Sequence, residues 1–263
     1  MATNPQIGRF NRPQSLSQLT RGRGWNSELT GFLLPLAVRN YFYEKYDFHN
    51  ATISPDWAVS NSGGAGAADY AVNALEMGTV RGTTGTTDNG SVEIHFGMVM
   101  FDAARNPGME VASKFDVVTG HAFEMAFADA PSTASTLNVS ALTAGGVPTI
   151  ASNGVTDQAG IVLNTDLTLA TAAVYSKGTT DAASGDNLGT FAPGAATYFL
   201  ARIQVRANGV YAIINDDPAQ AETLVLGPDT GILMRPHVIS ATKNTTTKLH
   251  DIDYIRLWAE RSY

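Results

Sequence analysis

The last residues of the chain, KLHDIDYIRLWAERSY, alternate between apolar and polar side chains with the two-residue period of a β-strand. The apolar side chains take both parities: Ile252, Tyr254 and Trp258 stand on even positions, and Leu249, Ile255 and Leu257 on odd positions. A strand this apolar would invite aggregation if it were left as an exposed edge. The sequence therefore predicts that residues 249–258 form a central or near-central strand, paired antiparallel with residues 41–48.

The same period recurs through the body of the chain. It is clearest in NYFYEKYDF, SVEIHFGMVMF, MEVASKFDVV and HAFEMAFADA, which begin at residues 40, 91, 109 and 121. Such alternation favours half-buried strands over helices. Residues 130–158 are rich in Ser, Thr, Ala and Gly, which predicts loops with one or two short strands. Two later segments, AGIVLNTD and ATAAVYSKG, predict a further pair of strands.

A three-stranded meander is predicted for YFLARIQVRANGVYAIINDDPAQAETLVL. A strand from Tyr198 to Arg206 is followed by Asn208-Gly209, a pair that supplies the positive φ angles of a type I′ hairpin turn. The return strand runs from Val210 to Ile214, and a second turn over residues 215–218 leads into ETLVL. Turns this short make neighbouring strands antiparallel.

The chain resembles the concanavalin-A-like, or laminin-G-like, jelly roll in three features. They are these strands and turns, the final strand DIDYIRLW, and the early aromatic strand ending YDFHNA, with Trp57 shortly after it. FEMAFADA also resembles a recurring stretch of such proteins in tailed bacteriophages. There it precedes a Ser/Thr/Asn-rich segment and a short apolar strand, here AGIVLN. The resemblance spans residues 41–260. It implies an all-β, antiparallel jelly-roll β-sandwich whose first and last strands lie side by side in one sheet.

Residues 1–38 are expected to form an extended N-terminal arm that precedes a single jelly-roll domain at residues 39–263, because prolines and glycines interrupt any helix there. The first 40 residues hold five arginines against one acid, Glu28, a charge of +4 that leaves −11 for the rest of a chain of net charge −7. A basic arm on an acidic body predicts docking on a negatively charged partner. The residues expected to contact the partner are Arg9, Phe10, Arg12, Leu16, Arg21, Arg23 and Trp25.

The sequence offers few groups for catalysis. It has no cysteine, which excludes a thiolate nucleophile, a thiolate zinc site and a disulfide framework. It contains no nucleophile elbow, zinc-protease, P-loop or dinucleotide motif, and its five histidines lack metal-ligand spacing. Glycosidases use paired carboxylates, but Glu124 and Asp129 are five residues apart and would point to opposite faces of a regular strand. We therefore expect no enzyme activity, no metal and no cofactor.

Two other groups of acids have both a functional and a structural interpretation. Asp251 and Asp253 share a face of the last strand, as catalytic acids would. They are interpreted instead as polar positions on a partly exposed face, since no loop-borne acid partner can be identified. Asp216 and Asp217, beside Asn215, could bind calcium in a loop. A plain turn is favoured, because Asx residues form turns on their own account.

Carbohydrate binding is the main alternative to a purely structural role, because related lectin folds bind sugars with exposed aromatic side chains and polar loops. The candidate residues for glycan binding are Trp57, Tyr70 and Tyr175. For Trp57, packing in the core of the sandwich is favoured over a sugar platform, since large aromatic side chains dominate core energetics.

The resemblance, the missing catalytic motifs and the basic arm lead to one hypothesis: a non-enzymatic structural protein of a tailed bacteriophage virion, of the capsid decoration or cement type. It would bind the major capsid protein and itself, as a homotrimer or another homo-oligomer. It would be made in the host cytoplasm without a signal peptide and stand on the capsid surface, without membrane contact or dedicated nucleic-acid binding. The alternative is a lectin-like carbohydrate-binding module on a virion or cell surface, and a glycoside hydrolase comes third.

Overall fold

The computed structural model describes residues 41–260, apart from 50–51, 63–65, 74–75, 77, 131–136, 138, 143–147, 151–154, 166–170, 181–182 and 190. The chain divides into two compact units, and the unit Tyr43–Ala259 holds the β-sheets. Of the unit made by Met1–Phe42 and Glu260–Tyr263, the structure describes Tyr41, Phe42 and Glu260. The predicted arm at residues 1–38, with its candidate partner contacts from Arg9 to Trp25, lies outside the described residues.

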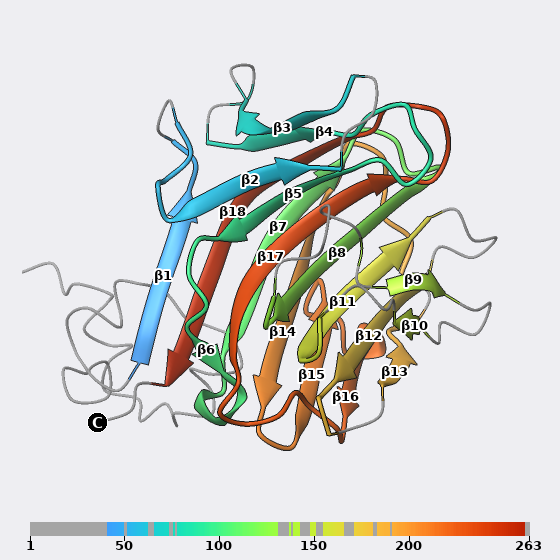
Figure 1. Ribbon diagram of the computed structural model, residues 1–263. Helices are drawn as coiled ribbons and strands as arrows, with labels where there is room; N and C mark the ends of the chain where they lie inside the picture. Colours follow the sequence, from blue (N-terminus) through green and yellow to red (C-terminus); the bar gives the residue numbers. More distant parts are fainter. Residues whose placement is uncertain are drawn as a thin grey trace, which may run out of the picture. The chain divides into compact units, whose positions relative to one another are not determined.

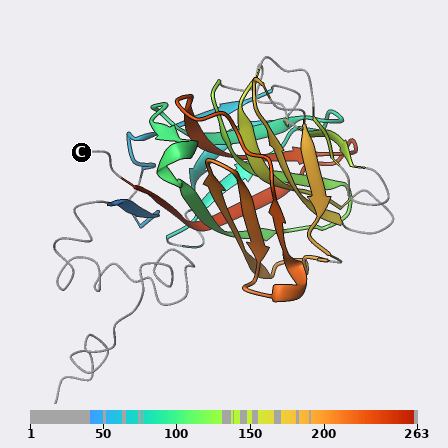
Figure 2. The ribbon, with the colours of Figure 1, turned by 90° about the horizontal axis from the view of Figure 1, so that it is seen from below.

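Two antiparallel β-sheets pack face to face (Figures 1 and 2). The back sheet of Figure 1 has the order β16 (Ala221–Leu224), β15 (Gly209–Ile214), β14 (Tyr198–Arg206), β7 (Gly108–Phe115), β18 (Leu249–Glu260), β4 (Val80–Thr83) and β3 (Ala68–Val72), and β1 (Tyr41–Asp47) also pairs with β18. The front sheet has the order β13 (Ser184–Asn187), β12 (Thr171–Lys177), β11 (Gln158–Asn164), β8 (His121–Ala128), β17 (Leu233–Thr242), β5 (Ser91–Phe96) and β2 (Trp57–Asn61), and β6 (Phe101–Asp102) pairs with β17. The predicted all-β sandwich is confirmed.

Smaller elements complete the described chain. A separate hairpin joins β9 (Val139–Leu142) to β10 (Pro148–Ile150), within the segment that predicted one or two short strands. The predicted pair at AGIVLNTD and ATAAVYSKG is the antiparallel pair β11–β12. Two 3-10 turns occur at Ala103–Arg105 and Pro218–Gln220. Each begins after an aspartate that caps it, because the Asp102 and Asp217 side chains accept hydrogen bonds from backbone N–H groups two residues on.

Strand β8 shows how alternation builds the core. All of its residues are buried, because the strand is covered on both faces. Phe123, Met125 and Phe127 point toward the back sheet, where the Phe123 ring packs edge-on against Phe115 and Phe199 with ring centroids 5.9 and 5.6 Å apart. The alternate residues Ala122, Glu124, Ala126 and Ala128 point outward. Small side chains on this outward face leave room for a further layer above it.

The final strand, β18, lies between β7 and β4 in the back sheet, and its interior placement confirms the prediction. Its expected neighbour β1 also pairs with it, and Figure 1 draws the two strands in opposite directions. The register with β7 shifts between Ile252 and Tyr254, which leaves Asp253 as a bulged residue. Because of this bulge, Ile252 on an even position and Ile255 and Leu257 on odd positions are all fully buried.

The predicted meander is present as β14, β15 and β16, but the turn assigned to Asn208-Gly209 is wrong. Arg206 pairs with Gly209, so the turn residues are Ala207 and Asn208, and neither has a positive φ. Gly209 is needed for a different reason: a Cβ there would lie 2.1 Å from the carbonyl oxygen of Leu224 on β16. The consecutive positive φ angles occur in the second turn, at Asn215 and Asp216, with values of 53° and 56°.

Two histidines lie in the core between the sheets. The His121 ring bonds through Nε2 to the Ser240 hydroxyl at 2.6 Å, and the His250 ring bonds through Nδ1 to the Tyr70 hydroxyl. The His250 ring also packs against Phe123, with centroids 5.3 Å apart. Burial lowers the pKa of His121 to about 3, and burial together with the charge of His121 lowers the pKa of His250 well below its ordinary value. Both side chains are therefore neutral in the folded protein near neutral pH.

Acidification should destabilise the fold through these two histidines. The unfolded chain binds a proton at each of them as the pH falls below about 6.5, whereas the folded chain does not. The free energy of unfolding should therefore fall between pH 6.5 and about 3, by at most about 1.4 kcal/mol per pH unit for each histidine. Urea denaturation at several pH values measures the slope. His121→Gln should flatten it, the control His49→Gln at an exposed position should not, and identical slopes for all three proteins would contradict the assignment.

Candidate functional site

The face of the front sheet that points away from the back sheet, here called the outer face, is unusually polar for a buried surface. The strand registers place its side chains in rows that cross β5, β17, β8, β11 and β12. One row holds Glu93, Ile239, Glu124 and Val162; the next holds His95, His237, Ala126, Gly160 and Tyr175; the third holds Arg235, Ala128, Gln158 and Lys177. Charged and amide groups thus surround a strip of small residues on β8 and β11.

Glu124 is the centre of a fully buried hydrogen-bond network on this face. Its Oε1 accepts a hydrogen bond of 2.7 Å from the Tyr175 hydroxyl and lies 3.4 Å from His237 Nε2. Its Oε2 accepts a bond of 3.1 Å from the backbone N–H of Val139 on β9. Val139 packs with Tyr175 in one apolar cluster, against which Ile150 of β10 is also packed. One carboxylate therefore ties the β9–β10 hairpin down over the outer face.

The space for the Tyr175 ring comes from Gly160 on the neighbouring strand. The two residues are paired in the β11–β12 register. A Cβ at Gly160 would lie only 2.7 Å from Cε1 of the Tyr175 ring and 2.6 Å from the Cβ of Ala126. Only small residues at positions 126 and 160 leave room for the Tyr175 side chain to reach Glu124.

A second polar group lies on the outer face around Glu93. Its carboxylate accepts a hydrogen bond of 3.3 Å from the Ser60 hydroxyl and lies 3.5 Å from His95 Nδ1. Arg235 Nη2 stands 4.0 Å from Glu93 Oε1, which is an ion pair too long for a hydrogen bond. Burial lowers the pKa of Arg235, against the opposing effect of Glu93.

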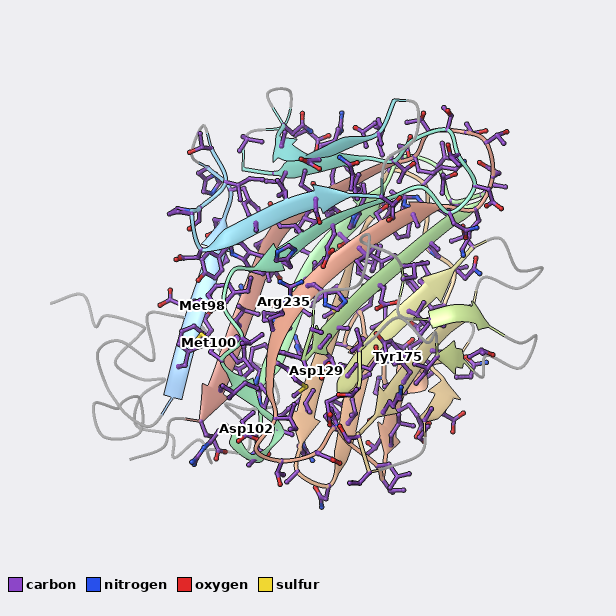
Figure 3. The ribbon with its side chains drawn as sticks, in the orientation of Figure 1. Met98, Met100, Asp102, Asp129, Tyr175 and Arg235 are labelled. Carbon is purple, nitrogen blue, oxygen red and sulfur yellow. The ribbon has the colours of Figure 1, made fainter. Side chains whose placement is uncertain are left out.

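Arg235 and Gln158 each have two buried polar atoms without hydrogen-bond partners among the described residues, and His95 on the same face has one, Nδ1. Arg235 is 8 % exposed, and its Nε and Nη2 bond to no described residue. Gln158 is fully buried, and neither its amide nitrogen nor its amide oxygen has a partner among the described residues. The two side chains flank Ala128 in one row. Figure 3 labels Arg235 on β17 and Tyr175 on β12 of the front sheet.

The three aromatic residues that are candidates for glycan binding are all buried, so none presents an exposed ring face. Trp57 is 5 % exposed and packs edge-on against Tyr46 and Phe96, with centroids 5.4 and 5.5 Å apart, in agreement with its interpretation as a core residue. Tyr70 is buried in the sandwich interior beside His250. Tyr175 is buried on the outer face beneath the hairpin.

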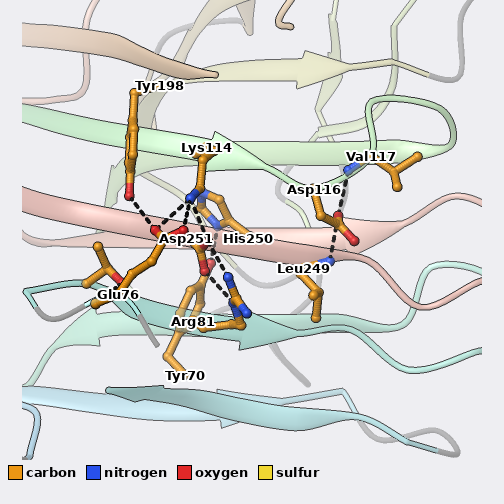
Figure 4. Close-up of polar contacts among 11 residues, drawn as sticks. Tyr70, Glu76, Arg81, Lys114, Asp116, Val117, Tyr198, Leu249, His250 and Asp251 are labelled. Atoms are coloured by element: carbon orange, nitrogen blue, oxygen red, sulfur yellow. Dashed lines mark hydrogen bonds and ion pairs between the residues drawn. The ribbon is translucent and has the colours of Figure 1, made fainter. Parts of the chain in front are cut away.

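Asp251 of the last strand belongs to a polar network of the back sheet, with Arg81, Lys114 and Glu76 around it (Figure 4). The carboxylate of Asp251 is 4 % exposed, is held by Arg81 through Nε at 2.6 Å and Nη2 at 2.7 Å, and lies 3.3 Å from Lys114 Nζ. Lys114 also binds both oxygens of Glu76, at 2.7 and 2.6 Å. Asp251 is thus buried and ion-paired rather than partly exposed, and the bulged Asp253 makes none of the hydrogen bonds or ion pairs of this network.

The remaining acids take part in turns. Asp216 accepts a hydrogen bond of 2.7 Å from Arg202, and the Asn215 side chain accepts one of 2.8 Å from the Leu200 N–H. Asp217 caps the following 3-10 turn. Asp129 accepts bonds from the backbone and hydroxyl of Thr156 at 3.1 and 2.6 Å. Within the described part of the chain, no three His, Asp or Glu side chains gather as a metal site, and no helix is long and apolar enough to cross a membrane.

Removing the Tyr175 hydroxyl should loosen the hairpin. Tyr175→Phe deletes a hydrogen bond to a buried carboxylate and should lower the free energy of unfolding by about 1.5–3 kcal/mol. Limited proteolysis should then cut faster between residues 139 and 150. Tyr211→Phe is the matched control, because the Tyr211 hydroxyl is only half-buried and bonds to no described residue. Equal protection of the hairpin in both variants would show that Glu124 does not hold it.

No protein-family model and no curated protein matches this chain. Solved structures do resemble it. The carbohydrate recognition domain of Emp47p matches with a TM-score of 0.56 and 9 % identity, over 82 % of this chain and 94 % of that one. A protein of unknown function from Shewanella oneidensis MR-1 matches with 0.52 and 15 %, over 85 % and 90 %. The β-glucanase of Bacillus licheniformis matches with 0.50 and 12 %, over 85 % and 99 %. At such identities the likeness shows the fold alone, a concanavalin-A-like β-sandwich.

Proposed function

We propose that this protein is a non-enzymatic, lectin-like module that binds carbohydrate at the outer face of its front sheet. The observation that carries the proposal is the pair Arg235 and Gln158, whose buried polar atoms have no hydrogen-bond partners among the described residues. An unpaired buried polar group costs about 1–3 kcal/mol. A ligand rich in hydroxyl groups would supply the missing partners and offset that cost on binding.

The surroundings of Glu124 support binding rather than hydrolysis. A glycosidase needs two carboxylates that flank the scissile bond and reach it. Both oxygens of Glu124 already bond within the protein, and the β9–β10 hairpin covers them. Similar folds are used in both ways, since Emp47p carries a carbohydrate recognition domain and the Bacillus licheniformis protein is a glucanase. The engaged carboxylate favours the first kind of use for this chain.

Calorimetric titration with a panel of neutral and acidic oligosaccharides tests the proposal. At least one sugar should bind with a millimolar or tighter Kd, and Arg235→Gln should weaken that binding. Arg206→Gln is the control, since Arg206 is an exposed arginine on a strand of the other sheet. The protein should release no new reducing ends from the sugars. Hydrolysis by the natural chain that disappears in Glu124→Gln would contradict a non-enzymatic role.

A second candidate function is that of a bacteriophage capsid decoration protein, with the major capsid protein and further copies of this chain as partners. An exposed apolar patch favours it: Met98, Val99, Met100 and Leu233 are 59, 45, 40 and 50 % exposed. The patch is continuous, because the Met100 N–H bonds to the Met234 carbonyl oxygen at 3.0 Å and β6 pairs with β17 at Leu233. Figure 3 shows Met98 and Met100 side by side. Exposed patches of this kind mark protein–protein contacts, and methionine suits adaptable surfaces.

Co-purification with virions at a fixed ratio to the major shell protein tests this second function. Changing Met98 and Met100 together to serine should lower occupancy on the particle, because it removes apolar area from the proposed contact. Val225→Ser is the control, since Val225 is 80 % exposed and lies outside the patch. Absence of the protein from purified particles would contradict the virion function and would leave the glycan proposal to stand by itself.

A further inference from the structure

Arg235 presents an unused edge of its guanidinium group. Nε and Nη2 are both buried and both lack partners among the described residues. These two nitrogens form one planar edge of the guanidinium group, whose two parallel N–H groups match the two oxygens of a carboxylate.

The same edge binds carboxylates elsewhere in the molecule. Arg81 uses Nε and Nη2 to hold the two oxygens of Asp251, at 2.6 and 2.7 Å. Arg202 uses the same two nitrogens on Glu110, at 2.8 Å and 2.5 Å. At Arg235 the neighbouring carboxylate of Glu93 stands 4.0 Å from Nη2 and does not occupy the edge. Arg81 and Arg202 thus pair this edge internally, Arg256 leaves its buried Nε unpaired while Nη1 bonds to Glu110, and Arg235 leaves both Nε and Nη2 without a hydrogen bond to any described residue.

Further donors accompany Arg235 in its row. Gln158, on the other side of Ala128, offers a buried amide whose nitrogen and oxygen have no partners. Its β12 neighbour Lys177 adds a positive charge, with Nζ at 3.4 Å from the Val155 carbonyl oxygen. Two strand spacings, about 10 Å, separate the backbones of Arg235 and Gln158. The single methyl group of Ala128 between them lets both side chains meet one ligand from opposite sides.

The acids of this face have internal contacts of their own: Glu93, whose Oε1 stands 4.0 Å from Arg235 Nη2, accepts a hydrogen bond from the Ser60 hydroxyl. Glu124 bonds to Tyr175 and Val139. Asp157 accepts bonds from the Thr179 hydroxyl, and from the Asp229 N–H at 2.8 Å. The row from Arg235 to Lys177 therefore offers an anion two cationic groups and one amide.

From this arrangement we infer that the ligand is an acidic sugar, whose carboxylate binds the Nε–Nη2 edge of Arg235 while Gln158 bonds to its hydroxyl groups. The inference rests on the proposed carbohydrate function and specifies its ligand class. Glutamine suits the second role because its amide both donates and accepts, as a sugar hydroxyl does. An acidic peptide would offer the same carboxylate but fewer hydroxyl groups for the amide.

Titration of the full-length chain with matched sugars tests the inference. The probes are a galacturonic acid trisaccharide against its carboxyl-reduced form, and sialyllactose against lactose. At least one acidic member should bind about tenfold more tightly than its neutral counterpart. Arg235→Gln should abolish that difference, and Arg235→Lys should keep part of it, because lysine retains the charge but not the two-pronged edge. The control Arg206→Gln should leave it unchanged.

Three other results of these titrations would each contradict a different statement. Equal Kd values for acidic and neutral members would overturn carboxylate recognition and leave carbohydrate binding in place. Absence of binding to every sugar would overturn the proposed function itself. Tighter binding of a glutamate-rich peptide than of any sugar would contradict an acidic sugar as the ligand and would assign the Nε–Nη2 edge of Arg235 to a protein ligand.

Gln158→Met separates ligand binding from a structural role. Methionine has a similar volume and carries no amide, so the substitution removes two unpaired polar atoms from a fully buried position. The free variant should melt at a higher temperature than the natural chain and bind the acidic sugar more weakly. Weaker binding by a more stable protein cannot be attributed to unfolding. A lower melting temperature would show that the amide serves the fold and would overturn its role as a ligand contact.

Discussion

The buried carboxylate of Glu124 decides what the front sheet can do. It gathers the Tyr175 hydroxyl, the His237 ring and the Val139 N–H in a place without solvent. Removing any of these partners would leave a buried charge short of hydrogen bonds, which is among the more expensive defects in a protein. The hairpin is therefore held to the sheet by electrostatics as well as by its apolar contacts. The hairpin thus covers part of the outer face of the front sheet, and Arg235 and Gln158 lie in a neighbouring polar row of the same face.

Alternation predicted the strands, because a half-buried strand keeps a two-residue period in its apolar side chains, and the resemblance to the concanavalin-A-like jelly roll implied their arrangement as a sandwich. In the sequence, the apolar residues of the last strand change from even to odd positions between Ile252 and Ile255. The bulge at Asp253 accounts for this change. The hairpin turn was misplaced because Asn208-Gly209 is a strong local signal. The glycine is fixed instead by the approach of the Leu224 carbonyl oxygen on another strand, a long-range contact that no local pattern reports.

The candidate site was harder to predict, because alternation separates two faces without saying which one a third layer will cover. Tyr175 could have faced solvent had Val139 and Ile150 not packed against it, and the sequence around these two residues has no clear period. Arg235 and Gln158 were missed. The signal for Arg235 was present, since it stands inside LMRPHVISAT, a strand in which nine of ten residues are buried. A lone arginine in such a buried strand needs a charged or hydrogen-bonding partner, and the sequence does not indicate which residue that is.

The two faces of the sandwich treat buried charge differently, and the difference bears on function. On the back sheet, Arg81 with Asp251 and Arg202 with Glu110 are closed pairs, which add little net stability but leave nothing unsatisfied. On the front sheet, the corresponding edge of Arg235 is left open beside an unpaired amide. Arg256 on the back sheet also has a buried Nε without a hydrogen-bond partner among the described residues, but its Nη1 bonds to Glu110, whereas Arg235 lacks partners on both Nε and Nη2. Buried polar groups without partners lower stability. That Arg235 and Gln158, both of this kind, lie in one row is therefore better explained by a ligand than by packing.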